Sequence, residues 1–179
     1  MRRLALLAVS LSAAVGAASC TGAVENGCGR ALHDRTLRPG VGFGGLRLGM
    51  SAADVEAWIG PPERLTGKAW EYPSCGFGLA FGPDQRLGAL LAGGHPTLNE
   101  RFTVESEEGL GIGSSREEIV DALGEPPSTS SAGRMLHYDA RGIVWTLDEG
   151  GRVSHLTIRR PRPDVENDAP RATPAADAV

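Results

Sequence analysis

Apolar and polar side chains alternate along the centre of this chain in a way that predicts two sets of β-strands. A period of two is typical of strands with one buried face. Six segments show it: 69–73, 76–81, 86–91, 134–138, 142–148 and 152–159. The side chains predicted to face a core on the two central strands are Phe77, Leu79, Phe81, Ile143, Trp145 and Leu147. Pro83-Asp84 and Gly150-Gly151 stand where tight hairpin turns are needed.

A short helix is predicted before each set of strands, at 51–60 and 115–124. Both begin with a capping-box pattern, a serine at the N-cap and a carboxylate three residues later: Ser51 with Asp54, and Ser115 with Glu118. Val55, Trp58 and Ile59 recur at helical spacing, so we expect one apolar stripe. Gly60 and Gly124 are expected to end the helices.

These two halves are an internal repeat. The stretch Gly45 to Val55 returns as Gly109 to Ile119, and further residues recur in step: Tyr72 and Tyr138, Gly76 and Gly142, Arg86 and Arg152. The sequence therefore predicts an α+β fold in which two tandem repeats, 41–98 and 99–159, each form a helix plus a three-stranded antiparallel meander. Joined sheet edge to sheet edge, the two repeats would make a two-layer sandwich with the helices on one side.

The N-terminus has the pattern of a secretory signal peptide over residues 1–19. Arg2 and Arg3 precede an apolar run, and the small residues before Cys20 are typical of a cleavage site. The segment resembles a bacterial lipobox, which predicts acylation of Cys20 and a protein anchored to a membrane, the outer membrane in a Gram-negative cell. The alternative is ordinary cleavage near Ala18. Residues 20–40 are expected to form a flexible lipid-anchored tether, and residues 160–179, rich in proline and acids, a disordered tail.

Charge and cysteine content narrow the choice of partners. Removing residues 1–19 takes two arginines from the 18 basic residues and none of the 22 acids, so the mature net charge is 16 − 22 = −6. An acidic chain without clustered basic residues argues against nucleic acid as a partner. Cys28 and Cys75 remain, and an even number in an exported chain predicts a disulfide between them; two unpaired thiols are the alternative.

Candidate catalytic chemistry is scarce. His33, His95, His137 and His155 show no metal-ligand spacing. Gly109-x-Gly111-x-Gly113 lacks the residues that complete a phosphate-binding loop, and Ser114-Ser115 is explained by the helix cap. We therefore predict no catalytic residue, no cofactor and no metal, and a protein that is not an enzyme.

The order Gly-Leu-x-Leu-Gly-x-Ser, a capped helix ending in Gly-x-Pro, an aromatic-x-Tyr strand and a hairpin closed by Arg resembles the BamE (SmpA/OmlA) repeat. It is also similar to the tandem repeats of the β-lactamase-inhibitor-protein fold. The resemblance covers about Gly45 to Ile158. It implies a small envelope lipoprotein that binds another protein through its exposed sheet face or its loops.

That resemblance gives three alternatives for function. The first is a non-enzymatic binding or assembly module, with five possible partner-binding residues: His137, Tyr138, Asp139, Val144 and Thr146. The second is an inhibitor of an extracytoplasmic enzyme such as a β-lactamase, and the third is a small-ligand carrier or an enzyme. The first is the prediction; its envelope partner is not identified by the sequence.

Overall fold

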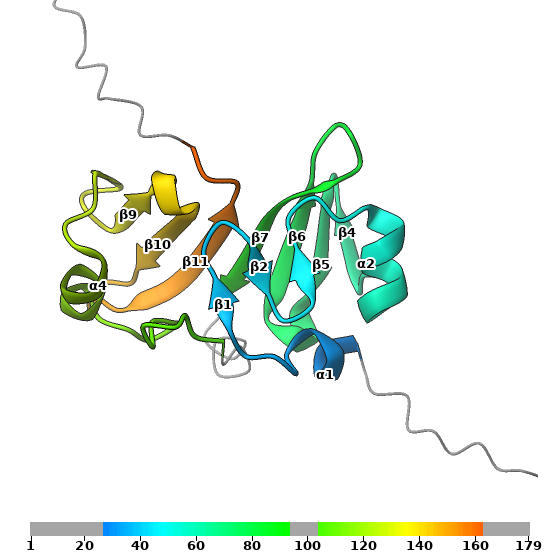
Figure 1. Cartoon of the computed structure of the whole chain (residues 1–179), viewed down its shortest axis with the longest axis horizontal. Helices are drawn as coiled ribbons and strands as arrows, with labels where there is room; N and C mark the ends of the chain where they lie inside the picture. The colour runs from blue at the N-terminus through cyan, green and yellow to red at the C-terminus, as the bar shows by residue number, and fades with distance from the viewer. Residues whose placement is uncertain (1–26, 94–103, 163–179) are drawn as a thin grey trace, which may run out of the picture.

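A computed structural model describes residues 27–93 and 104–162 (Figure 1). The predicted signal peptide, Cys20, His95 and residues 163–179 lie outside the described residues. The first part contains α1 (Gly27–Ala31), β1 (Leu37–Arg38), β2 (Gly42–Phe43), β3 (Leu46–Arg47), α2 (Ala52–Ile59), β4 (Arg64–Thr66), β5 (Ala69–Tyr72), β6 (Phe77–Phe81) and β7 (Leu87–Gly93). The second contains α4 (Arg116–Leu123), β8 (Ser128–Ser130), β9 (Met135–Tyr138), β10 (Ile143–Leu147) and β11 (Val153–Arg159). Short 3-10 turns, η1 (Pro73–Cys75) and η2 (Asp139–Arg141), follow β5 and β9.

One eight-stranded antiparallel sheet runs through both repeats, in the order β4-β5-β6-β7-β11-β10-β9-β8. The two repeats meet where β7 pairs with β11, from Ala89 opposite Arg159 to Gly93 opposite His155. We call this junction the seam. Hydrogen bonding across the seam makes the sheet continuous, and the second repeat therefore extends the first instead of stacking on it.

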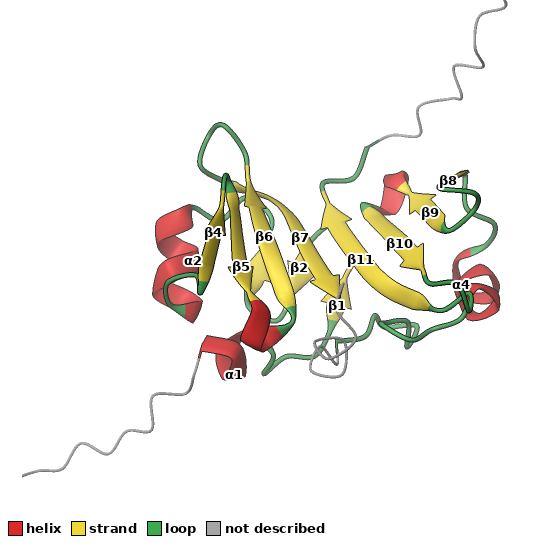
Figure 2. Ribbon diagram, turned by 180° about the vertical axis from the view of Figure 1, so that it is seen from behind, coloured by secondary structure: helices red, strands yellow, loops and turns green. Residues whose placement is uncertain are grey.

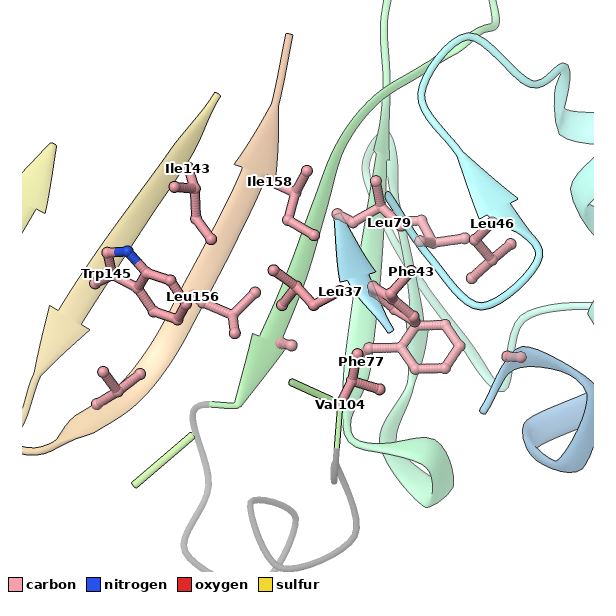
Figure 3. Packing of buried hydrophobic residues seen from close by; sticks show 14 of the residues in the cluster. Leu37, Phe43, Leu46, Phe77, Leu79, Val104, Ile143, Trp145, Leu156 and Ile158 are labelled. Atoms are coloured by element: carbon pink, nitrogen blue, oxygen red, sulfur yellow. The ribbon is translucent and has the colours of Figure 1, made fainter. Parts of the chain in front are cut away.

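A second, three-stranded sheet covers one face of the large sheet. It is formed by β1, β2 and β3, and Figure 1 shows it lying across β6 and β7. Its side chains Leu37, Phe43 and Leu46 are at most 1% exposed. The rings of Phe43 and Phe77 meet edge to face with centroids 5.3 Å apart, so the small sheet closes the core (Figure 3).

The two predicted helices form, and both capping boxes are present. Ser51 accepts a hydrogen bond from the backbone N–H of Asp54, and Ser115 accepts one from that of Glu118. Each helix stops at a glycine with positive φ, 86° at Gly60 and 81° at Gly124. Glycine adopts this conformation without steric cost, which explains why both copies of the repeat carry it there.

The predicted fold class is wrong. The protein is mostly strand, and its two repeats are not helix-plus-three-stranded meanders in a two-layer sandwich. The prediction missed β4 and β8, because these outer strands are exposed on both faces and carry no apolar alternation. It also missed β1, β2 and β3, because two-residue strands are too short to show a period.

The expected tether is also shorter than residues 20–40. From Gly27 onward the chain belongs to the fold: α1 packs beside α2, and Ala31 and Leu37 are fully buried. At the other end, residues 160–162 of the expected tail adjoin η2, where the Arg162 N–H donates to the Asp139 carbonyl at 2.9 Å. Isolated apolar residues such as Leu37 give no periodic signal, so only tertiary packing shows that this segment is ordered.

Residues present in both copies of the repeat hold matching structural positions. The hydroxyl of Tyr72 donates to the Gly60 carbonyl, and that of Tyr138 donates to the Gly124 carbonyl. Two arginines do the same for the glycines before the helices: Arg86 donates to Gly49 and Arg152 to Gly113, each at 2.9 Å. The repeated pattern thus encodes the fold, so functional residues are to be sought where the two copies differ.

Candidate functional site: the open face of the large sheet

The face of the large sheet opposite the small sheet has no helix or strand over it in the described residues (Figure 2). Strand register places one row of cross-strand neighbours along the middle of this open face. The row runs Arg64, Glu71, Gly78, Leu91, Thr157, Val144, His137 and Ser128. Alternate side chains of a strand point to opposite faces, so on the six inner strands the neighbours of these residues face the core, whereas β4 and β8 are exposed on both faces.

The two copies of the repeat differ at each pair of equivalent positions in this row. Gly78 corresponds to Val144, and Leu91 corresponds to Thr157. The core side behaves differently, because both copies keep apolar residues there: Leu79 and Trp145, or Leu90 and Leu156, are all at most 1% exposed. The fold therefore fixes the character of the core face and leaves the open face free to vary.

A shallow hollow of about 360 Å³ lies on the open face beside the seam. Both repeats contribute to it, with Gly78, Leu91 and Gly93 from the first and His155 and Thr157 from the second. It exists because Gly78 has no side chain, whereas Val144 fills the equivalent place in the second repeat and is itself only 4% exposed. Leu91 stands in the hollow with 42% of its surface exposed.

The charged groups of the open face lie towards its margins and are paired. Arg64 and Glu71 approach to 3.5 Å on the outer strands of the first repeat. Asp139 forms an ion pair with Arg159 where β11 ends. Glu71 also lines the hollow, and from Gly78 to His137 the row has only neutral residues and a histidine. Such a surface favours a partner with an uncharged, apolar contact region.

His137 and His155 both lie on the open face, but β10 separates them. Val144 stands opposite His137 and Thr146 opposite His155 in the register. The His137 Nε2 is 2.8 Å from the Ser130 hydroxyl, and the His155 Nδ1 is 2.9 Å from that of Ser154. Each ring is therefore oriented by its own serine and not by the other histidine.

Of the five predicted partner-binding residues, His137, Val144 and Thr146 lie on the open face by strand register, although Val144 is only 4% exposed. Tyr138 is not among them. It is 3% exposed, its hydroxyl donates to Gly124, and burial raises its pKa, with Glu125 the next contributor. Its choice as a binding tip is corrected: the side chain points into the core, as that of Tyr72 does. Asp139 lies in η2 and is held by Arg159.

Sequence reasoning missed Leu91, Gly93 and His155 as parts of one site. Gly93 lies at the last position of β7 and His155 on β11, opposite each other across the seam. Their proximity depends on how the repeats join, which local patterns do not encode. The signal that was available was the difference between the copies at Leu91 and Thr157.

Cys28 and Cys75 form the predicted disulfide, with Cα atoms 5.3 Å apart. It connects α1 to η1, at the opposite end of β5 from the hairpin that leads into it. Glu63 lies beside the two sulfurs, and these three residues are the one cluster in the described part of the chain with metal-ligating side chains close enough to share an ion. Since both thiols are consumed in the disulfide, the cluster does not offer a thiolate site in this state.

Among the described residues, no helix is long and apolar enough to cross a membrane. This observation leaves the predicted anchor at Cys20 untouched, because that residue lies outside the described part.

Comparison with known proteins identifies no family. No family model matches the chain, and no curated protein matches it. Among solved structures it is similar to the crystal structure of a DUF4309 family protein, YjgB, of Bacillus subtilis, with a TM-score of 0.48 and 17% sequence identity, over 75% of this chain and 93% of that one. At that level the similarity supports no inference about function.

These comparisons correct the resemblance drawn from the sequence. The repeat pattern suggested BamE (SmpA/OmlA) or the β-lactamase-inhibitor-protein fold, but no family model of either kind matches. The pattern was misleading because its glycines, serines, tyrosines and arginines are the residues that cap helices and close hairpins. Such residues recur wherever a short capped helix precedes a hairpin.

Proposed function

We propose that this protein is an exported, membrane-anchored, non-enzymatic module that binds another protein through the open face of its eight-stranded sheet. Export and anchoring rest on the signal-like residues 1–19 and on Cys20. Binding rests on the described fold, and the two parts of the proposal are tested separately.

The observation that carries the proposal is the hollow at the seam. An uncovered sheet face normally presents polar side chains to water. Here the centre of the face holds a 42% exposed leucine beside glycines, and Glu71, the one carboxylate among the residues that line the hollow, is paired with Arg64. Leu91 projects beside a cavity, and exposed apolar side chains next to pockets are typical of the central residues of protein interfaces.

The shape of the hollow favours a protein over a small molecule. It is shallow, and the residues that line it are apolar or glycine except for Glu71, His155 and Thr157. Small-molecule sites are usually deeper and combine an apolar lining with several directed polar groups. We therefore expect the partner to place one large apolar side chain, from a loop or an extended segment, against Gly78 and Leu91.

Filling the hollow tests this directly. Gly78→Val copies the residue that the second repeat carries at the equivalent position, and a Cβ at Gly78 would meet no atom closer than 3.6 Å. The fold is therefore expected to accept it. Leu91→Ser is the second variant. A photo-crosslinker placed on the open face of the wild-type protein should form a covalent adduct with the partner in native membranes. In either variant the yield of this adduct should fall at least about tenfold.

Leu65→Ser is the matched control. Leu65 is 65% exposed, but register with Trp70 places it on the opposite side of the sheet. If all three variants reduce the adduct equally, or if none does, the open face is not the binding surface. An adduct to one soluble hydrolase would identify the partner as an enzyme and the protein as its inhibitor.

The anchor has its own test. Mass spectrometry of the mature protein from bacterial membranes should find an acylated cysteine at residue 20, and Cys20→Ala should release the protein into the soluble fraction. A mature N-terminus that begins elsewhere, with no acyl group, would refute the anchor and leave the binding proposal standing.

A further inference from the structure

A second hollow, of about 390 Å³, lies at the other side of the first repeat, between the segment that follows α1 and the outer surface of α2. It is lined by Arg30, His33, Asp34, Gly44, Gly45 and Trp58. None of these residues belongs to the open face or lines the hollow at the seam, so the two hollows are separate.

Trp58 is not among the buried residues of α2. The helix buries Val55 and Ile59, while Trp58 is 40% exposed, although the sequence places all three on one stripe. The equivalent residue of the second repeat is Ala122, on a helix with the same cap and the same length. The repeat therefore folds without an aromatic residue here, and Trp58 calls for another explanation.

Two glycines make room for the hollow. A Cβ on Gly44 would lie 1.8 Å from the carbonyl oxygen of Ala31, and a Cβ on Gly45 would lie 2.4 Å from the indole ring of Trp58. Any larger residue would separate α1 or the indole from the β2–β3 hairpin. The disulfide from Cys28 holds α1 in the same place. The indole is therefore held against backbone on one side while part of it stays open to solvent.

The rim of the hollow supplies both donors and acceptors. Within the described residues, neither the Arg30 guanidinium nor the His33 ring has a hydrogen-bond partner. Asp34 accepts a hydrogen bond from the Thr36 N–H and forms an ion pair with Arg38, each at 2.9 Å. Hydrogen bonds from Thr36, followed by that from Arg38, lower the pKa of Asp34 to about 2. Its carboxylate therefore remains an acceptor at any ordinary pH.

We propose that this hollow binds a pyranose ring of a β-linked glycan, with the apolar face of the sugar on the indole of Trp58 and its hydroxyl groups on Arg30 and Asp34. A β-linked glucose or N-acetylglucosamine ring has equatorial hydroxyl groups, which leave a face of C–H groups on one side and a ring of donors and acceptors around the edge. An exposed indole with donors and an acceptor at its rim matches that division. The carboxylate of Asp34 would repel a purely anionic ligand, and the guanidinium of Arg30 would repel a purely cationic one. A neutral polyhydroxylated ligand therefore fits the charges best.

The indole N–H signals in a proton–nitrogen correlation spectrum give a direct test. The chain has three tryptophans, Trp58, Trp70 and Trp145. Titration of the full-length protein with cellotriose and with tri-N-acetylchitotriose is expected to shift the Trp58 signal, while that of Trp145, which is fully buried, stays in place. Trp58→Ala, which copies Ala122, assigns the signal and should weaken binding at least about tenfold without loss of fold. Trp58→Phe should restore part of the affinity.

Three outcomes would overturn the inference. The first is the absence of any shift at 20 mM saccharide, a concentration about twentyfold above a millimolar Kd. The second is a shift that persists unchanged in Trp58→Ala, which would place the sugar elsewhere. The third is a Trp58 signal that responds to vesicles containing anionic phospholipid and not to either saccharide, which would make the surface a membrane contact. Gly78→Val leaves this hollow intact, so failure here and failure of the open-face proposal are separable.

Discussion

At the scale of single residues, the internal repeat separates structural side chains from the rest. Tyr72 and Tyr138 are both 3% exposed and both donate to the carbonyl of the glycine that ends the preceding helix. A tyrosine that is repeated and hydrogen-bonded in this way links the helix end to the sheet. Trp58 and Leu91 are instead unique to one repeat and exposed, which is why both proposals rest on them.

The tyrosine bond predicts equal effects in the two repeats. Tyr72→Phe and Tyr138→Phe each remove one donor from a carbonyl oxygen near the surface, so each should lower the free energy of unfolding by about 1 kcal/mol. Urea denaturation at pH 8 measures both. A loss in one repeat alone would mean that the two copies are not equivalent at this position.

Alkaline pH adds a second signature for Tyr72. Burial, assisted by Glu56 and then Glu63, raises its pKa to about 12, against about 10 in an unfolded chain. Between these values the folded state holds a proton that the unfolded state has lost, so the free energy of unfolding must fall as pH rises from 10 to 12. Tyr72→Phe should make this fall shallower than in the wild type. Identical slopes would contradict the raised pKa.

At the scale of elements, two short helices are stable because their ends are satisfied. Both α2 and α4 have eight residues, and isolated helices of that length are marginal in water. A capping box at the start, a glycine at the end and one buried stripe hold each against the sheet. The edge strands of the large sheet, β4 and β8, are only three residues long and are exposed. Their shortness limits pairing with other chains.

Removing either serine cap should lower the free energy of unfolding by the same amount. Ser51→Ala and Ser115→Ala are each expected to reduce the free energy of unfolding by about 1 kcal/mol. The helices lie at opposite ends of the sheet (Figure 1), so the double variant should lose about 2 kcal/mol by simple addition. Thermal and urea unfolding of the three variants checks this. Substantial non-additivity would indicate coupling between the helices.

At the scale of the whole molecule, the seam makes two repeats one folding unit. The pairing of β7 with β11 continues the sheet, and a single core cluster includes residues of the small sheet and of both repeats, such as Leu37, Leu79 and Trp145 (Figure 3). A repeat on its own would expose the apolar side chains that pack on the core face beside the seam.

One cooperative unfolding transition is therefore predicted. In a urea titration, the indole N–H signals of Trp70, in the first repeat, and Trp145, in the second, should lose intensity with the same midpoint. Reduction of the Cys28–Cys75 disulfide should lower the free energy of unfolding by up to about 4 kcal/mol, in the chain-entropy model for a separation of 47 residues, and the shared midpoint should fall with it. Two separate midpoints would show that the repeats fold independently.

Local patterns predicted much of the framework correctly. They predicted the helices at 51–60 and 115–124 with their caps and terminal glycines, the inner strands and the disulfide partners. Helices, caps and strands depend on contacts between residues close in sequence, and the disulfide followed from the scarcity of cysteine. The open-face positions of His137, Val144 and Thr146 followed from strand alternation. The same alternation places Tyr138 on the core face, where it is 3% exposed, so its choice as a binding tip is wrong.

What the sequence determined by itself is the repeat: where helices start and stop, which strand positions are apolar, and which side chains both copies share. The tertiary structure decided how the repeats join, that a small sheet covers one face, and that Gly78, Leu91 and His155 surround one hollow while Trp58 lines another. The physical reason is that periodicity and capping are local, short-range constraints. Pairing across the seam and the covering of one face depend instead on which arrangement buries the most apolar surface, a property of the whole chain.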